Sequence, residues 1–191
     1  MEPTTTTHIY YLLDSSSSME SIKDRVIQSM NEFLMHQRQI PHCYIHLFAF
    51  SNTIKIISQC QEIQKVRLLD ATSYIPYGSS ALYDAIGMIL TTQFFNEKDI
   101  NMFILLTDGM ENSSYHFHRT QIQHLIQKHQ KFIHFMWIGS HQYSTLVGKE
   151  LGINHDACLS FDDEGIECAI QATRDAILRY HQDSSRRLSF S

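Results

Sequence analysis

Residues 8–18 read His8-Ile9-Tyr10-Tyr11-Leu12-Leu13-Asp14-Ser15-Ser16-Ser17-Ser18. This stretch begins as a nearly continuous apolar run, which is typical of a strand buried on both faces of a parallel sheet. It then changes at once to one acidic residue and a row of hydroxyls, a composition that ends a strand and begins a loop. The stretch therefore predicts a central parallel strand that ends in a polar loop.

The rest of the chain repeats this change between apolar runs and helical patterns. Such alternation predicts a mainly parallel sheet that helices cover on both faces. Strands are expected at residues 8–13, 44–50, 53–57, 102–106, 132–138 and 157–161, and helices at about 22–34, 81–95, 119–131, 144–151 and 164–181. Because only Ser51-Asn52 separates two of these strands, they must be antiparallel neighbours. We predict an α/β fold, a three-layer doubly wound sandwich with a mostly parallel sheet and one antiparallel edge strand.

Length and composition are consistent with one domain. The chain has 191 residues, of which 43% are hydrophobic, so it can build a sizeable core without disulfide bonds. We assign residues 8–181 to this domain. Residues 1–7 are expected to be a flexible N-terminus, and the polar, serine-rich residues 182–191 a flexible tail.

Charge and N-terminal composition exclude several classes of function. The formal net charge is −5, and the body of the chain has no cluster of Lys or Arg, which argues against nucleic-acid binding. Met1-Glu2-Pro3 is not followed by a basic segment, and the apolar stretch 9–13 is too short for a signal peptide or a membrane span. We therefore expect a cytoplasmic protein without a membrane span. The sequence leaves the oligomeric state open.

The residues that bind soft metals show no familiar spacing. Four cysteines occur without a CxxC pair, so we expect buried free thiols: Cys43, Cys60, Cys158 and Cys168. The histidines at 116, 118, 124 and 129 lack an HExxH pattern, so they are interpreted as surface residues.

Three polar loops stand at successive junctions between strands and helices. They are residues 14–18, 78–80 and 107–109. In an open α/β sheet, ligands bind beyond the carboxyl ends of the strands, in the loops that lead into the helices. The three loops can therefore converge on one face of the molecule.

The residue types in these loops point to a hard cation. Asp14 and Asp108 supply carboxylates, while Ser16, Ser18 and Ser80 supply hydroxyls, with no Cys or His among them. Oxygen donors of this kind suit Mg²⁺, with Mn²⁺ or Ca²⁺ as possible substitutes, rather than zinc or copper. Since Ser16 and Ser18 are two residues apart, both can face one ion while their neighbours face away. The sequence therefore predicts a Mg²⁺ site with a vacant coordination position.

Each loop also has an ordinary explanation when taken alone. Asp14, Ser79 or Ser80 could cap a helix, and Asp108-Gly109 is a common turn dipeptide. Three such loops at consecutive junctions of one α/β pattern favour a shared site over three unrelated caps and turns.

In these loops the sequence resembles the von Willebrand factor type A (VWA) family. The metal-ion-dependent adhesion site (MIDAS) of that family combines D-x-S-x-S, a threonine and an aspartate within T-D-G. The matching segments are 14–18, 78–85 and 107–112, and their wording is similar to compact stand-alone bacterial or phage members. Two residues depart from the pattern: Ser17 replaces a glycine, and Ser80 replaces the threonine.

The resemblance implies a role for each candidate residue. Ser16 and Ser18 would be direct ligands, Ser80 would take the threonine position, and Asp14 and Asp108 would bind the ion directly or through water. The family implies binding rather than catalysis, with a protein partner that offers an Asp or Glu to the open position. We therefore expect an adaptor or scaffold domain that is not an enzyme.

Two alternatives remain. A Mg²⁺-dependent phosphatase or phosphotransferase of the haloacid-dehalogenase type also has an Asp after its first strand, but it needs a second Asp where this chain has Ser16. The G-x-S-x-G, GxxxxGK[ST] and GxGxxG motifs of other enzyme classes are absent. The second alternative is a VWA domain with a purely structural role.

Overall fold

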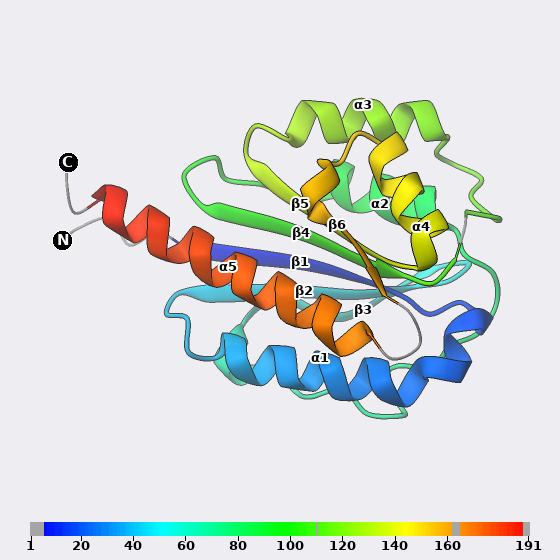
Figure 1. Cartoon of the computed structure of the whole chain (residues 1–191), viewed down its shortest axis with the longest axis horizontal. Coiled ribbons are helices and arrows are strands. Elements are labelled where there is room, and N and C mark those ends of the chain that lie inside the picture. Colours follow the sequence, from blue (N-terminus) through cyan, green and yellow to red (C-terminus); the bar gives the residue numbers. More distant parts are fainter. Residues whose placement is uncertain (1–5, 110, 162–164, 189–191) are drawn as a thin grey trace.

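The computed structural model describes residues 6–109, 111–161 and 165–188. For residues 141–144 and 182–188 it describes the backbone only. Its centre is a six-stranded sheet in the order β3-β2-β1-β4-β5-β6. Helices α1 and α5 lie on one side of this sheet, and α2, α3 and α4 lie on the other (Figure 1). The predicted three-layer α/β sandwich is confirmed.

All six strands expected along the chain are present, and among the described residues every strand pair but one is parallel. Their bounds are β1 Thr7–Asp14, β2 Cys43–Phe50, β3 Ile54–Glu62, β4 Ile100–Thr107, β5 Ile133–Ser140 and β6 Cys158–Phe161. Strand β3 pairs antiparallel with β2 at the edge of the sheet, as the short link Ser51-Asn52 predicts. However, β3 continues five residues beyond the expected end at residue 57, because register shifts let it follow β2 further.

The helices are α1 Lys23–Gln37, α2 Leu82–Thr92, α3 Arg119–His129, α4 His141–Glu150 and α5 Ile166–Leu188, with short 3₁₀ turns at η1 Ser17–Ile22, η2 Ile63–Lys65 and η3 His155–Ala157. The helix expected at residue 22 is thus preceded by a separate 3₁₀ turn. Helix α5 runs past the expected end at 181, and its expected first residue, Glu164, lies outside the described residues. In the described part of the chain, no helix is both long and apolar enough to cross a membrane.

Alternation along β1 explains why its sequence is apolar throughout. Tyr11 and Leu13 belong to the core cluster beneath α1 and α5, whereas Tyr10 and Leu12 belong to the cluster beneath α2 and α3. Successive side chains of a strand point to opposite faces, so a strand with helices on both sides needs apolar residues at every position. This is the pattern that the opening stretch of the sequence predicts.

The four cysteines are free, as expected, but they are not all buried. Cys43 is buried and Cys158 is half-buried, whereas Cys60 and Cys168 are exposed. The expectation of burial is therefore wrong for two of them. Cys60 lies on the edge strand, and Cys168 lies on α5 between positions that face the core, so neither is enclosed by neighbouring elements.

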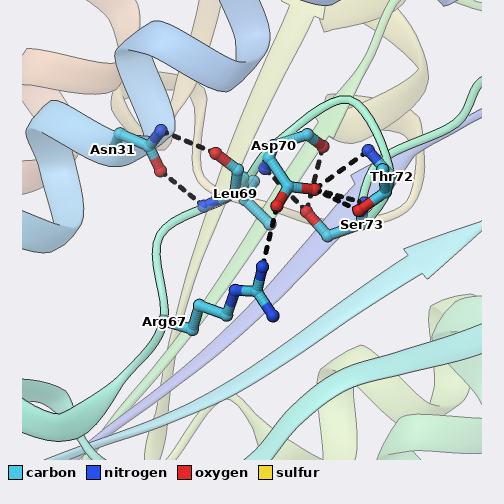
Figure 2. A network of polar contacts seen from close by, with 6 residues as sticks. All are labelled: Asn31, Arg67, Leu69, Asp70, Thr72 and Ser73. Atoms are coloured by element: carbon cyan, nitrogen blue, oxygen red, sulfur yellow. Dashed lines mark hydrogen bonds and ion pairs between the residues drawn. The ribbon is translucent and has the colours of Figure 1, made fainter.

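A long loop between η2 and α2 is held in place by polar contacts with α1 (Figure 2). Asn31 donates from Nδ2 to the Leu69 carbonyl at 2.9 Å and accepts from the Leu69 amide at 2.7 Å. The next residue, Asp70, accepts from the backbone amides of Thr72 and Ser73, both at 2.9 Å. The Thr72 hydroxyl, which donates to the same carboxylate at 2.6 Å, and these two amides hold the pKa of the Asp70 carboxyl well below its ordinary value. These hydrogen bonds define the path of the loop that leads toward Ser80.

We predict that Asn31→Ala lowers the free energy of unfolding by about 1–3 kcal/mol, because two half-buried backbone groups of Leu69 lose their partner. Asn31→Asp keeps the acceptor oxygen but loses the donor, so its effect should be smaller. Urea denaturation followed by circular dichroism measures both. Equal stability of Asn31→Ala and the wild type would show that this contact does not hold the loop.

Candidate metal centre

The predicted loops meet at the carboxyl ends of two adjacent strands, after which the chain leads to opposite faces of the sheet. Strands β1 and β4 are adjacent and parallel, with Leu13 opposite Leu106. After β1 the chain enters α1 on one side of the sheet, and after β4 it enters α3 on the other (Figure 1). Chains that diverge in this way leave a crevice beyond the carboxyl ends of the two strands. Asp14 ends β1, and Asp108 follows the end of β4, so both stand at this crevice.

Asp14 is the most enclosed of the candidate residues, with 0% of its surface exposed. Its Oδ1 accepts from the Ser16 amide at 2.7 Å, and its Oδ2 accepts from the hydroxyls of Thr107 at 2.6 Å and Ser80 at 3.2 Å. Burial raises the pKa of the Asp14 carboxyl above its ordinary value, and these hydrogen bonds oppose the rise only in part. Because burial outweighs these hydrogen bonds, a nearby positive charge would further stabilise the ionised form of the Asp14 carboxyl.

The other candidates continue this chain of oxygen atoms. Ser16 Oγ lies 3.1 Å from Ser18 Oγ, and Ser18 Oγ donates to Asp108 Oδ1 at 2.8 Å. Ser15, in contrast, turns away and donates to the Phe50 carbonyl at 2.9 Å. The structure therefore brings all five predicted residues together, and Ser15 faces away from them as expected. Their assignment as metal ligands stays a prediction.

The capping explanation does not account for these serines. The N-cap residue of η1 is Ser16 and that of α2 is Ala81, and neither forms a side-chain capping hydrogen bond. Ser80 directs its hydroxyl toward Asp14 instead. The serine hydroxyls thus form contacts within the crevice and do not cap the helix ends.

Backbone contacts hold the first loop against its neighbours. Ser15 donates from its amide to the Phe50 carbonyl at 2.7 Å, and Ser17 donates to the Gly78 carbonyl at 3.0 Å. The buried Tyr74 hydroxyl donates to the Asp14 carbonyl at 2.6 Å. The loop held by Asn31 and Asp70 therefore reaches back to the end of β1.

The second and third loops are tied to each other in the same way. Asn112 accepts from the Ser80 amide at 2.9 Å through Oδ1 and donates from its own amide to the Ser80 carbonyl at 3.1 Å. Ser140, the last residue of β5, donates to the Asp108 carbonyl at 2.6 Å. Three separate segments are therefore locked in one relative position.

Sequence reasoning missed four of these supporting residues. Thr107 stands inside the T-D-G motif, so its position could have signalled its role. Asn112 ends the matching segment 107–112, so its position also could have signalled a role. Nothing in the local sequence distinguishes Tyr74 and Ser140 from ordinary polar residues, because their partners are far away along the chain.

The histidines considered from the sequence lie elsewhere. His116, His118 and His124 are exposed, and His129 is half-buried. Within the described ranges, none of them belongs to a group of three or more metal-binding side chains. The interpretation as surface histidines therefore holds for all but the half-buried His129.

Only the comparison of structures, and not that of sequences, identifies the fold. No protein-family model matches the sequence, and no curated protein matches it. Solved structures do match: proximal thread matrix protein 1 from the mussel byssus has a TM-score of 0.66 at 16% identity, over 89% of this chain and 45% of that one. A structure of the same mussel protein with a zinc-occupied MIDAS motif has a TM-score of 0.61 at 18% identity, over 91% of this chain and 46% of that one.

Two further neighbours carry the VWA name. The ArnB paralog VWA2 from Sulfolobus acidocaldarius has a TM-score of 0.62 at 20% identity, over 86% of this chain and 44% of that one. The SpRpn10 VWA domain has a TM-score of 0.58 at 10% identity, over 84% of this chain and 90% of that one. The chain thus spans less than half of the mussel and Sulfolobus proteins. On the likeness to these structures, this chain has the von Willebrand factor type A fold.

Proposed function

We propose that this chain is a metal-dependent protein-binding domain. Asp14, Ser16, Ser18, Ser80 and Asp108 would hold one divalent cation, Mg²⁺ by preference, and the cation would attract a carboxylate of a partner protein. In this role the chain is a cytoplasmic adaptor or scaffold and not an enzyme.

The observation that carries the proposal is the continuous set of side-chain oxygens from three separate loops. Ligands of an octahedral Mg²⁺ site bond at about 2.1 Å, so neighbouring ligand oxygens lie about 3.0 Å apart. The spacings of 3.1 Å between Ser16 and Ser18 and 2.8 Å between Ser18 and Asp108 are close to this value. The oxygens of Ser16, Ser18 and Asp108 therefore have the spacing of neighbouring ligands of a small cation.

The donor set supports Mg²⁺ over softer ions. All five side chains offer oxygen, and hard cations such as Mg²⁺, Mn²⁺ and Ca²⁺ prefer oxygen. The zinc-occupied MIDAS motif of the mussel protein indicates that a site on this fold can also accept zinc. The binding test therefore compares the affinity for Mg²⁺ with that for Zn²⁺.

The exposure of the site supports a role in binding. Asp14, Ser16 and Ser80 are buried, whereas Ser18 is exposed and Asp108 is half-buried. The inner side of the site is thus closed by protein, and its outer side opens to solvent. A partner carboxylate could approach only from that side, where a divalent cation would attract it strongly.

The phosphatase alternative has less support. Its general acid belongs at position 16, which in this chain is a serine whose amide and hydroxyl contact Asp14 and Ser18. A serine hydroxyl does not readily give up or accept a proton near neutral pH, so it would be a poor replacement. In the purely structural alternative the domain has no partner protein. Affinity capture with Mg²⁺ or EDTA distinguishes this alternative from the main proposal.

We predict that Mg²⁺ stabilises the wild type against urea, by about 2.7 kcal/mol at a concentration of 100 times its dissociation constant. Asp14→Ala and Asp108→Ala should lose this gain because each removes a carboxylate from the site. Ser17→Ala, which changes the exposed serine between two proposed ligands, should keep it. Calorimetric titration with Mg²⁺, Mn²⁺ and Zn²⁺ gives the order of affinity. Unchanged binding in both aspartate variants would rule out this site.

Thr107→Val tests the support of the buried carboxylate. The variant keeps the shape of the side chain but removes the 2.6 Å hydrogen bond to Asp14 and the acceptor of the Gly109 amide at 3.1 Å, so we expect a loss of about 1.5–3 kcal/mol in unfolding free energy. Thr173→Val is a matched control, because Thr173 is equally buried but donates only to a carbonyl within α5. If both variants lose the same stability, Thr107 has no special role at Asp14.

Affinity capture tests the function itself. The full chain is immobilised and exposed to native lysate with Mg²⁺ or with EDTA, alongside Asp14→Ala. We expect proteins that bind only the wild type with Mg²⁺, and that are released when their contacting Asp or Glu is changed to Asn or Gln. Capture that does not depend on Mg²⁺ would contradict the proposal and favour a structural role. Turnover of a model phosphate ester that disappears in Asp14→Ala would instead indicate an enzyme.

A further inference from the structure

A second group of metal-binding side chains lies at the opposite end of the sheet. His8 on β1, His46 on β2 and Cys60 on β3 each place one ligand atom within 4.8 Å of the others. His8 and Asp14 are six residues apart on one strand, so the two groups are separated by about 20 Å. This cluster is therefore distinct from the crevice at the carboxyl ends of the strands.

The two imidazoles face each other at a distance that suits one ion. His8 Nδ1 lies 3.4 Å from His46 Nε2. With Zn–N bonds of about 2.1 Å, two nitrogens of a tetrahedral zinc site lie about 3.4 Å apart. The two nitrogens are already at this separation.

Neighbouring aromatic rings hold both imidazoles in place. His46 stacks on Tyr10 with 4.2 Å between ring centroids, and His8 stacks on Tyr44 with 5.5 Å. The His46 side chain is nearly enclosed, with 5% exposed, and its Nδ1 has no hydrogen-bond partner. The stacking keeps the His46 ring in one orientation, with Nε2 rather than Nδ1 directed at His8.

Cys60 owes its position to an irregularity in the edge strand. The pairing of β2 and β3 shifts register between Ile45 and Leu47, on either side of His46. Cys60 has a φ of 47°, in the left-handed region that non-glycine residues rarely adopt. Such irregularities redirect side chains and collect at functional sites. Here the irregularity accompanies a thiol that is exposed to solvent and within reach of both histidines.

Asp99 completes the surroundings of the cluster. Its Oδ2 lies 3.7 Å from His8 Nε2, the ring nitrogen that does not face His46. Asn96 donates to the same carboxylate at 2.8 Å and so orients it. A histidine that binds a metal through one nitrogen commonly directs the other toward a carboxylate. His8 has this arrangement.

We propose that His8, His46 and Cys60 bind one Zn²⁺ ion. Two imidazole nitrogens and one thiolate form a donor set that zinc accepts readily and Mg²⁺ does not. When the S–Zn bond forms, the Cys60 thiol releases its proton to solvent. The exposed side of the cluster leaves the fourth coordination position to water. Bound zinc links the edge strand β3 to β1 and β2 at the sheet's amino end.

The test uses the full chain under reducing conditions, with Co²⁺ as a spectroscopic probe for zinc. We expect one Co²⁺ to produce a thiolate-to-cobalt charge-transfer absorption, which an all-oxygen site cannot produce, and Zn²⁺ to displace it. Cys60→Ser should abolish the absorption and weaken Zn²⁺ binding about tenfold or more. Because Cys60 is exposed, this variant is expected to fold; the buried His46 is tested separately by His46→Gln.

Two controls separate this site from others. Cys168→Ser removes another exposed thiol, and it should leave the absorption unchanged. Asp14→Ala should also keep the absorption, because it affects only the cation at the opposite end of the sheet. No charge-transfer absorption in the wild type, or the same absorption and zinc affinity in Cys60→Ser as in Cys168→Ser, would overturn the proposal.

Discussion

The buried carboxylate of Asp14 is the constraint on which the rest of the candidate centre depends. It ends the central strand β1 with no exposed surface, and burial raises the pKa of its carboxyl group. A charge in this position is stable only if donors surround it, and Thr107, Ser16 and Ser80 provide them from three different segments. The need to satisfy one buried group therefore brings together loops that are distant in sequence.

The two proposed metal sites show how one sheet can offer different chemistry at its two ends. At the carboxyl ends of the strands, loops supply hydroxyls and carboxylates, which suit hard cations. At the amino end, side chains on the strands themselves supply two imidazoles and a thiol, which suit zinc. If Mg²⁺ and Zn²⁺ were added together, Mg²⁺ would therefore prefer the oxygen site and Zn²⁺ the site with two imidazoles and a thiol. The central strand β1 contributes to both ends, through His8 and Asp14.

Local patterns predicted much of the fold because each depends on nearby residues. The apolar run of β1 reflects helices on both faces, and the short link Ser51-Asn52 was enough to predict an antiparallel pair. The predictions failed where neighbours in space decide the outcome. Strand β3 is longer than expected because β2 provides backbone partners across a register shift, and Cys60 is exposed because it lies on the edge strand of the described sheet.

The sequence by itself determined the alternation of strands and helices, the identity of the polar loops and the hard donors within them, since these follow from composition and spacing. Only the tertiary structure decided that Tyr74, Asn112 and Ser140 support the same crevice, and that His8, His46 and Cys60 share one corner of the sheet. The physical reason is strand pairing: it sets residues from separate parts of the chain side by side, and no local pattern records which residues become neighbours.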